Sequence, residues 1–498
     1  MPRTKSIRAI YLVRIKNIKL NMQIISKNVI ATSGVKFGTS GARGLVEQFT
    51  PEVCAAFTAA FIDAMRQGFE FTHVSIGIDR RPSSPDMAAA CCAAVQELGL
   101  EVDYFGVLPT PAMAYQALKA KQPAIMITGS HIPFDRNGIK FYRPDGEITK
   151  VDEELIVCSE AIVPTISTLT VPSVKHEAEQ LYIERYLNLV KPSLLQGKRV
   201  GIYQHSSAGR DLYEKLFRLL GAEVIALGRS VAFVPIDTEA VREEDIEQGK
   251  IWAKTEKLDF LFSTDGDGDR PLIADETGKW LRGDIVGLLT ARYLKIDALA
   301  IPVSCNTSIE ASQAFKTVVR TKIGSPYVIE GMQELNQSFD RVAGFEANGG
   351  FLLGTDVLVN EQTIAALPTR DAVLPILALM AASIESAQPL SRLVADLPQR
   401  FTASDRLQSF ATEKSQQLIQ RWSKTPQQGL KTLGLNHKKI IEQNETDGLR
   451  WTFDDQTIVH LRPSGNAPEL RCYIEAESEH SAHILLNQIL GKLVVLAA

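Results

Sequence analysis

The stretch Leu258-Asp-Phe-Leu-Phe-Ser-Thr-Asp265-Gly-Asp-Gly-Asp269 joins a short apolar run to a loop of alternating acids and glycines. The same order, a short apolar run that meets a polar loop, recurs at residues 73–84 and 198–209, and a stretch of helical composition follows each time. Strands that alternate with helices indicate βαβ units and mainly parallel sheets. We therefore predict an α/β fold.

The polar loops at the ends of these predicted strands are the places to search for a site. In open α/β sheets, ligands bind beyond the carboxyl ends of the strands. The C-terminal part of the chain differs, because residues 442–477 have the pattern of short antiparallel strands with helices on either side. We predict an α+β domain there.

Charge is unevenly distributed along the chain. The 498 residues carry a formal net charge of −4. Residues 1–30 contain seven Lys and Arg and no acids, which leaves 47 basic and 58 acidic residues, a net charge of −11, in the remainder. This acidic body argues against nucleic-acid binding, because neutralising phosphates requires a positive face. At roughly 100–200 residues per domain, the length predicts three to four domains.

The basic N-terminal segment has two interpretations. It is rich in cations and free of acids, as transit peptides are, but it lacks the uninterrupted apolar core of a secretory signal. The alternative is a loosely structured extension, or a translated leader upstream of a start at Met22. We favour this alternative, in either of its two forms, over a targeting peptide.

Cysteine usage and hydropathy indicate the compartment. The six cysteines form no C-x-x-C pair, which is typical of reduced thiols rather than of disulfides or a zinc site. The most apolar stretch, residues 373–382, contains a proline and is much shorter than the roughly 20 apolar residues of a membrane span. We predict a cytoplasmic protein without a membrane partner.

The acidic loop, residues 264–270, places Asp265, Asp267 and Asp269 at alternate positions. One tight turn can point several of these oxygens inward, and oxygen-rich sites suit Mg²⁺ or Ca²⁺. The alternative is a solvated acidic turn or a fragment of a calcium loop. An EF-hand needs a later glutamate and flanking helices, whereas a predicted strand follows directly here, so we favour Mg²⁺. Arg270 can orient a carboxylate or reach a phosphoryl oxygen.

The serine loop, residues 128–133, reads Thr-Gly-Ser130-His131-Ile-Pro, and Lys140 follows closely. A serine at a strand end can act as a nucleophile if a neighbour activates it. His131 is adjacent in sequence and need not face the hydroxyl, so it is not assigned as the base. No G-x-S-x-G elbow is present, which argues against an α/β-hydrolase. On local grounds alone, Ser130 is a turn residue and Lys140 a surface lysine.

The phosphate loop, residues 462–471, places Arg462 and Arg471 around the turn Ser464-Gly465-Asn466. Arginine matches phosphate oxygens with two parallel hydrogen bonds, and backbone amides and a hydroxyl add neutral donors. The alternative is a hairpin turn with surface arginines.

The sugar loop, Gly344-Phe-Glu346-Ala-Asn348-Gly-Gly350, joins a carboxylate and an amide in a flexible turn. This pairing suits sugar hydroxyls, but alone it is a weak signal.

The order of these four loops, together with Phe37-Gly-Thr-Ser-Gly-Ala-Arg43-Gly before them, resembles the α-D-phosphohexomutase family. Within that family the chain is most similar to bacterial phosphomannomutases and phosphoglucomutases, from about Gly34 to its end. The resemblance implies three related α/β domains with mixed sheets and a C-terminal α+β domain around a central cleft. The implied segments are a basic extension (1–33), domain I with the serine loop (34–172), domain II with the acidic loop (173–276), domain III with the sugar loop (277–395) and domain IV with the phosphate loop (396–498).

The resemblance also implies roles for individual residues. Ser130 would be a phosphoserine whose phosphate shares Mg²⁺ with Asp265, Asp267 and Asp269. The phosphoryl-transfer site would be lined by Arg43, His131, Lys140 and Arg270, with Lys140 a candidate general acid/base. Sugar hydroxyls would be read by Glu346 and Asn348. The non-reacting phosphate would be held by Arg462, Ser464, Gly465, Asn466 and Arg471.

Two loops depart from the common family patterns. The sugar loop usually reads Glu-x-Ser-Gly-His, whereas this chain has Asn348 in place of Ser and Gly350 in place of His. The phosphate loop often reads Ser-Gly-Thr-Glu-Pro, and here Asn466 and Ala467 replace Thr and Glu. Asn466 keeps a hydrogen-bonding side chain, so phosphate binding is expected to persist. The change in the sugar loop leaves the choice of hexose open.

The implied activity is the interconversion of mannose 6-phosphate and mannose 1-phosphate through a phosphoserine and a bound hexose 1,6-bisphosphate. Mg²⁺ would be the cofactor, the bisphosphate an activator, and a hexose phosphate the partner of a monomer or homodimer. Alternatives of the same class are phosphoglucomutase and phosphoglucosamine mutase. From other classes, an inactive sugar-phosphate-binding relative and a phosphatase stay open.

Overall fold

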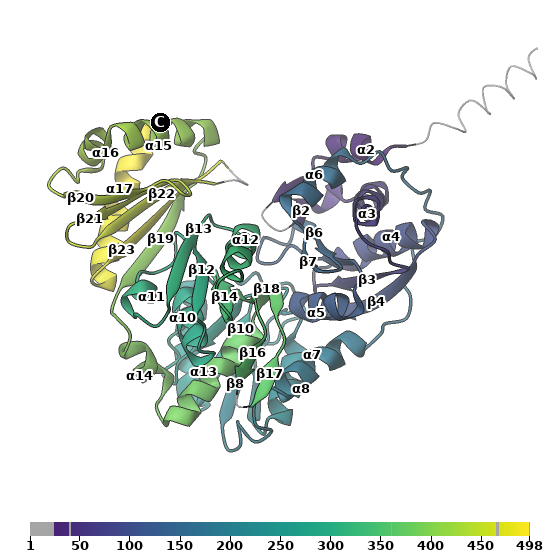
Figure 1. Ribbon diagram of the computed structural model, residues 1–498, viewed down its shortest axis with the longest axis horizontal. Helices are drawn as coiled ribbons and strands as arrows, with labels where there is room; N and C mark the ends of the chain where they lie inside the picture. The colour runs from purple at the N-terminus through teal and green to yellow at the C-terminus, as the bar shows by residue number, and fades with distance from the viewer. Residues whose placement is uncertain (1–23, 39–40, 360, 465–467, 498) are drawn as a thin grey trace, which may run out of the picture.

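The computed structural model describes residues 24–38, 41–359, 361–464 and 468–497. In this part of the chain, four main sheets follow one another, and each falls within one of the four predicted domain segments (Figure 1). This arrangement confirms three α/β domains followed by a C-terminal α+β domain. The domain boundaries themselves stay predictions.

Domain I has a mixed sheet with the strand order β1-β2-β6-β5-β3-β4, and a short strand, β7, pairs with β6. Its strands are β1 (Lys36–Gly38), β2 (Gly41–Leu45), β3 (His73–Ile78), β4 (Glu101–Val107), β5 (Ala124–Ile127), β6 (Arg136–Arg143) and β7 (Gly146–Glu147). Its helices are α2 (Ser26–Ser33), the 3-10 helix η1 (Val46–Gln48), α3 (Pro51–Arg66), α4 (Ser84–Glu97), α5 (Thr110–Ala120) and α6 (Lys150–Cys158). Helices α3 and α4 are rich in alanine and bury most of their side chains in the core of domain I, where they pack against each other.

The predicted N-terminal extension is described only from residue 24 onward. Helix α2 lies in this segment, contacts α3 and α6, and buries Ile30 in the core of domain I. Its first residue, Ser26, is also buried, and its hydroxyl donates to the carbonyl of Ala161 over 2.9 Å. The end of the segment thus packs with domain I, and the prediction for residues 1–23 lies outside the described residues.

Domain II has a four-stranded sheet in the order β11-β10-β8-β9. Its strands are β8 (Arg199–Tyr203), β9 (Glu223–Leu227), β10 (Phe260–Thr264) and β11 (Pro271–Ala274), and its helices are α7 (Glu177–Leu187), α8 (Arg210–Leu219) and α9 (Glu243–Thr255). Strand β8 is parallel to β9 and β10, while β11 returns antiparallel to β10. The acidic loop is the connection between β10 and β11.

Domain III has a five-stranded sheet in the order β13-β12-β14-β15-β18 and a separate hairpin, β16-β17. Its strands are β12 (Ala298–Pro302), β13 (Thr317–Thr321), β14 (Val342–Phe345), β15 (Phe351–Leu353), β16 (Val357–Val359), β17 (Gln362–Ile364) and β18 (Leu367–Asp371). Its helices are α10 (Gly283–Tyr293), α11 (Ser308–Ala311), α12 (Ser325–Leu335), α13 (Val373–Ser386) and α14 (Leu390–Ala395). The sugar loop connects β14 to β15.

The expectation of mainly parallel sheets is wrong, whereas the mixed sheets implied by the resemblance are confirmed. Among the described strands, parallel pairing is confined to β3 with β4 and β5, β8 with β9 and β10, and β12 with β13 and β14. The physical reason is connection length, because a parallel crossover needs roughly a dozen residues or more. Residues 128–135 and 265–270 are too short for such a crossover, so β6 and β11 return antiparallel.

Domain IV has a fully antiparallel sheet in the order β19-β23-β22-β21-β20, which confirms the predicted α+β domain. Its strands are β19 (Phe401–Leu407), β20 (Ile440–Asn444), β21 (Leu449–Phe453), β22 (Ile458–Pro463) and β23 (Leu470–Ala476). Its helices are α15 (Thr412–Lys424), α16 (Pro426–Leu433) and α17 (Glu479–Ala497). The separate core of this domain is built around the stacked rings of Trp422 and Trp451.

One apolar core extends through domains I, II and III. It includes residues of α5, α7, α8, α10 and α13, so these helices pack the three domains into one continuous core. The apolar run at residues 373–382 is part of the buried helix α13. Within the described residues, no helix is long and apolar enough to cross a membrane. All six cysteines are free thiols.

Candidate active site

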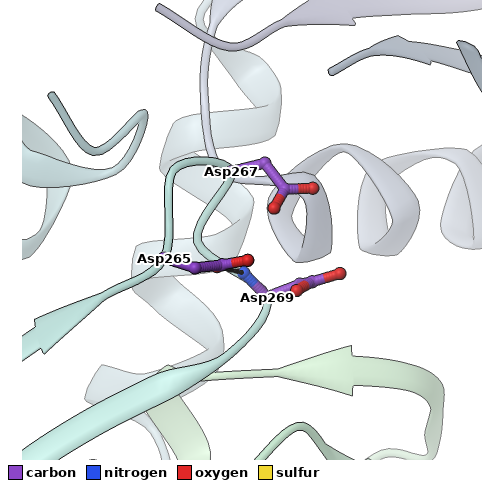
Figure 2. Close-up of side chains that lie close together, drawn as sticks. All are labelled: Asp265, Asp267 and Asp269. Carbon is purple, nitrogen blue, oxygen red and sulfur yellow. Dashed lines mark hydrogen bonds between the residues drawn. The ribbon is translucent and has the colours of Figure 1, made fainter. Parts of the chain in front are cut away.

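The three carboxylates of the acidic loop form a buried cluster (Figure 2). One oxygen of each of Asp265, Asp267 and Asp269 lies within 4.8 Å of the others. The turn is held by its own backbone, because Oδ1 of Asp265 accepts from the amides of Asp269 (3.2 Å) and Arg270 (3.3 Å). The prediction that one tight turn points several oxygens inward is thus confirmed.

The electrostatics of this cluster call for a cation. Burial, together with repulsion from Asp267 and Asp269, raises the pKa of Asp265 well above its usual range. Burial would also raise the pKa of Asp267, but attraction and hydrogen bonding from Lys140 hold it below its usual range. Oδ1 of Asp267 and Oδ1 of Asp269 are buried and accept no hydrogen bond from the described residues. Because hard cations prefer carboxylate oxygens, these atoms fit a bound divalent metal.

Ser130 faces the cluster from domain I. Its hydroxyl donates to Oδ2 of Asp265 over 2.6 Å, and the side chain is buried. The backbone φ of Ser130 is 55°, in the left-handed region, which costs a non-glycine residue about 1–3 kcal/mol and is concentrated at functional sites. Gly266 permits the contact between the two loops, since a Cβ there would stand 2.8 Å from the carbonyl oxygen of Ser130.

A residue that the sequence analysis did not single out clamps the serine loop. Arg81, in the loop after β3, is fully buried and ion-paired to Asp79. Its guanidinium donates to the carbonyls of Ser130 (3.0 Å), Pro133 (2.7 Å) and Arg136 (2.9 Å). A Cβ on Gly129 would stand 2.6 Å from this guanidinium, so glycine is needed there. The only feature of the sequence that could have pointed to Arg81 is its place in the polar loop that follows β3.

Lys140 is not a surface lysine but a buried one, which corrects the interpretation made from local sequence alone. Its Nζ lies 2.6 Å from Oδ2 of Asp267 and 2.8 Å from Oδ2 of Asp269. Strand β6 positions it, because Lys140 pairs with Met126 on β5, the strand that ends at the serine loop.

The other three predicted cationic and imidazole residues gather around the same cluster. Arg43, on β2, is flanked by like charges, and burial followed by repulsion from Arg270 and Arg370 lowers its pKa to about 10. Nη1 of Arg270 lies 2.8 Å from Nδ1 of His131, which itself lies 3.3 Å from Oγ of Ser130. Burial, then Arg270 and Arg43, hold the pKa of His131 well below its usual range. Since an arginine can only donate, Nδ1 of His131 is an acceptor here and the ring is neutral.

A second functional residue missed by the sequence analysis is Arg370 on β18. It is buried and joins two domains, with Nη2 2.9 Å from Oδ2 of Asp269 and Nη1 3.2 Å from Oε2 of Glu346. It thus ties the acidic loop to the sugar loop. Nothing in the surrounding sequence, Leu367-Pro-Thr-Arg-Asp371, marked it, because it lies inside a strand rather than in a polar loop.

The sugar loop is held in one conformation by bonds within it and from domain II. Oδ1 of Asn348 accepts from the amide of Gly350 (3.0 Å), and Glu346 accepts from the same side chain (3.5 Å). The hydroxyl of Thr238, in the loop before α9 of domain II, donates to the carbonyl of Asn348 over 2.7 Å. Both Glu346 and Asn348 are buried.

The phosphate loop is only partly described. Arg462 on β22 stands directly opposite Arg471 on β23, and Ser464 is buried at the end of β22. Like charges directly opposite each other are destabilising unless something offsets them. The predicted residues Gly465 and Asn466 lie outside the described residues. Within the described part of the chain, no hydrogen bond or ion pair joins Arg462 or Arg471 to the carboxylate cluster.

Fold and site together define a class of protein: a four-domain α/β protein in which side chains of domains I and III surround a buried carboxylate cluster of domain II, beside a strained serine. Family models of phosphoglucomutase/phosphomannomutase match all four domains: alpha/beta/alpha domain I at residues 34–161, domain II at 180–278, domain III at 282–401 and the C-terminal domain at 405–492. The chain belongs to the phosphoglucomutase/phosphomannomutase family.

Individual relatives agree with this membership. The chain is 54% identical to a phosphomannomutase of Salmonella muenchen over 96% of its own length and 98% of the relative. It is 42% identical to a phosphomannomutase of Sinorhizobium fredii, over 92% and 99% of the two chains. A solved structure of a phosphoglucomutase/phosphomannomutase family protein from Burkholderia thailandensis matches with a TM-score of 0.71, at 18% identity and over 94% and 98% of the chains.

Proposed function

We propose that the protein is a phosphohexomutase that interconverts mannose 6-phosphate and mannose 1-phosphate. The 54% identity to a phosphomannomutase over nearly the whole chain favours mannose over the other hexoses. The observation that carries the chemistry is the 2.6 Å bond from the strained Ser130 to Asp265 of the carboxylate cluster. It supports a serine that exchanges a phosphoryl group beside a bound metal.

The charges of the site support the presence of a phosphate on Ser130 together with a bound divalent cation, because the charges of these two groups cancel. Four carboxyl groups, Asp265, Asp267, Asp269 and Glu346, lie near four cations, Arg43, Lys140, Arg270 and Arg370. Their charges balance when all four carboxyl groups are ionised, and a cation beside Asp265 favours its ionised form because it offsets the repulsion that raises the pKa of that group. A phosphoserine carries about −2 at neutral pH, and Mg²⁺ carries +2. Adding both keeps this balance, whereas adding either alone leaves an uncompensated charge in a buried site, which is costly.

In the proposed reaction, the phosphoryl group of Ser130 passes to a hydroxyl of the hexose monophosphate. The P–Oγ bond breaks as the P–O bond to the sugar forms, the sugar hydroxyl gives up its proton, and Ser130 regains one. Lys140 is proposed as the general acid/base, and Arg43 and Arg270 as the groups that position the phosphoryl oxygens. When bound to the three aspartates, Mg²⁺ offsets charge on the transferring group.

The hexose 1,6-bisphosphate formed in this way turns over, and its other phosphoryl group returns to Ser130. Glu346 and Asn348 are proposed to read the sugar hydroxyls. Arg462, Ser464, Gly465, Asn466 and Arg471 are proposed to hold the phosphate that does not react, first at one end of the sugar and then at the other. The bisphosphate is also the proposed activator, because it can phosphorylate Ser130. A cytoplasmic location and a monomeric or homodimeric state stay predictions.

The deciding experiment uses ³¹P NMR to follow mannose 1-phosphate as it becomes mannose 6-phosphate, with Mg²⁺ and a trace of the bisphosphate present. Ser130→Ala should abolish the conversion. Ser415→Ala removes an equally buried serine from α15 in domain IV and should convert at the parent rate. More than a few per cent of parent activity in Ser130→Ala would overturn the phosphoserine assignment.

The same measurement distinguishes the rival functions. Faster turnover of glucose 1-phosphate or glucosamine 1-phosphate would reassign the substrate within the class. Release of inorganic phosphate in place of the isomer would indicate a phosphatase. No turnover of any hexose phosphate by the phosphorylated protein would indicate a binding relative.

A further inference from the structure

The turn between β20 and β21 of domain IV forms a hydrogen bond with domain III. Asp447 lies in this turn, and its Oδ2 accepts from the backbone amide of Ile323, in domain III, over 3.0 Å. The turn is pressed onto β22, because a Cβ on Gly448, where φ is +89°, would stand 2.3 Å from the carbonyl of Leu461. Nε2 of the buried His460 lies 2.6 Å from the carbonyl oxygen of Asp447. The backbone of Asp447 is therefore held in place by the turn and by His460, and its carboxylate accepts from the amide of Ile323.

The same oxygen of Asp447 also contacts the phosphate loop. Nε of Arg462 donates to Oδ2 of Asp447 over 2.7 Å, and both side chains are largely shielded from solvent. A guanidinium held through Nε keeps both terminal nitrogens for a two-point contact with a phosphate. Asp447 also supplies negative charge beside Arg462, which faces the like charge of Arg471 across the ladder.

Ile323 is part of a segment that contacts two other domains. This segment lies between β13 and α12. Two residues later, the hydroxyl of Ser325 donates to Oε2 of Glu147 in domain I over 2.9 Å. The other oxygen of Glu147 accepts from Thr369 (2.6 Å), the neighbour of Arg370. The bond from Asp447 therefore ends on a segment that is anchored close to the active site.

We propose that Asp447 is a positioning residue that orients Arg462 toward the substrate phosphate and links the phosphate loop to domain III. This inference rests on the proposed role of the phosphate loop, and it adds a residue outside that loop. Phosphate binding and the position of domain IV are then coupled. Any movement of domain IV away from domain III that separates Asp447 from Ile323 also moves the anchor of Arg462.

The test is a double-mutant cycle in the full-length protein between Asp447→Asn and Arg462→Gln. Asparagine keeps the shape and one acceptor but removes the charge. Because a hydrogen bond between charged groups is stronger than one between neutral groups, each variant should raise the KM for mannose 1-phosphate roughly ten-fold or more. Inhibition by inorganic phosphate should weaken by a similar factor. The double variant should show little further increase, because the two side chains act as one unit.

A merely structural role for Asp447 predicts a different pattern. In that case the melting temperature of Asp447→Asn falls, and the effects of the two substitutions on KM multiply. Asp455→Asn removes an exposed carboxylate, paired with Lys438, from the next turn of the same sheet and should leave KM unchanged. If Asp447→Asn does not fold, Asp447→Glu keeps the charge but displaces the carboxylate by one methylene, and the same cycle with Arg462→Gln applies.

The outcomes separate this inference from the proposed function. If Arg462→Gln raises KM and Asp447→Asn does not, or if the two effects multiply, the role of Asp447 is overturned and the phosphate loop stands. If Arg462→Gln leaves both KM and phosphate inhibition unchanged, the proposed phosphate role and the inference fail together. Loss of turnover in Ser130→Ala alone is independent of either result.

Discussion

Arg370 offers the sharpest test of how the active site is assembled, because one side chain joins the acidic loop to the sugar loop. Arg370→Met keeps much of the volume and removes the guanidinium that contacts Asp269 and Glu346 at 2.9 and 3.2 Å. Each hydrogen bond to a charged group contributes about 1.5–3 kcal/mol. Removing one partner of a buried ion pair typically destabilises a protein by about 3–5 kcal/mol. The cluster would also carry one uncompensated negative charge.

The expected result is a loss of both activity and stability. We expect kcat/KM for mannose 1-phosphate to fall at least 100-fold, equivalent to about 2.7 kcal/mol of lost transition-state stabilisation. The substrate brings further negative charge to a site that has lost a cation, so the effect should be larger at low ionic strength. A coupled assay with mannose 6-phosphate detection gives the rate, and calorimetry gives the melting temperature.

Arg370→Lys is the matched control. Lysine keeps the positive charge but offers a single nitrogen, which cannot bridge both carboxylates with the geometry of a guanidinium. It should recover part of the melting temperature and less of the activity. If Arg370→Met retained parent kcat/KM and parent stability, the bridge between Asp269 and Glu346 would be irrelevant, and this account of how the two loops are joined would be wrong.

Two further predictions concern the metal and pH. Asp267→Asn should lose activity about 100-fold without rescue by added Mg²⁺, and calorimetric titration should show weakened metal binding. Asp259→Asn, a partly exposed control in the same domain, should bind metal normally, and equal behaviour of the two variants would make the acidic loop only a turn. Burial lowers the pKa of His205 and His460 to about 4, so protonation favours the unfolded chain, and stability present above pH 6.5 is lost as pH falls toward 4. At pH 5, each histidine should lower the free energy of unfolding by about 2 kcal/mol relative to its value well above pH 6.5, as measured by urea unfolding. His460→Gln should remove its share, and an unchanged pH dependence would contradict this.

The chemistry of the site could be predicted where it is local in sequence. The rule that ligands bind at strand ends pointed to the serine loop and the acidic loop, and the structure brings these together at a 2.6 Å contact. Alternation of Asp and Gly was enough to predict a turn with inward oxygens. The short connections at residues 128–135 and 265–270 also predict that β6 and β11 return antiparallel.

The residues that could not be predicted act through partners distant in the chain. Arg370 lies inside β18, where a polar residue has no loop signature, and its partner Asp269 is contributed by another domain. The local sequence around Lys140 predicts an exposed lysine, whereas in the folded sheet its side chain is buried and contacts Asp267. Arg81 was in a loop already marked as a strand end, but nothing local distinguishes it from Arg80 beside it. Burial and pairing, which decide these roles, are properties of the assembled domains.

The salt bridges of the acidic loop have a consequence for how the domains of this chain relate as repeats. Asp267 is neutralised by Lys140 of domain I, and Asp269 by Arg370 of domain III. Domain II made alone would expose three crowded carboxylates with neither partner, and the loop would have to take up protons or open toward water. Domain II therefore depends on the two other α/β domains for the cations that pair with its carboxylates. Lys140 of domain I and Arg370 of domain III balance the charges of the acidic loop, so this site is complete only when the three domains have docked.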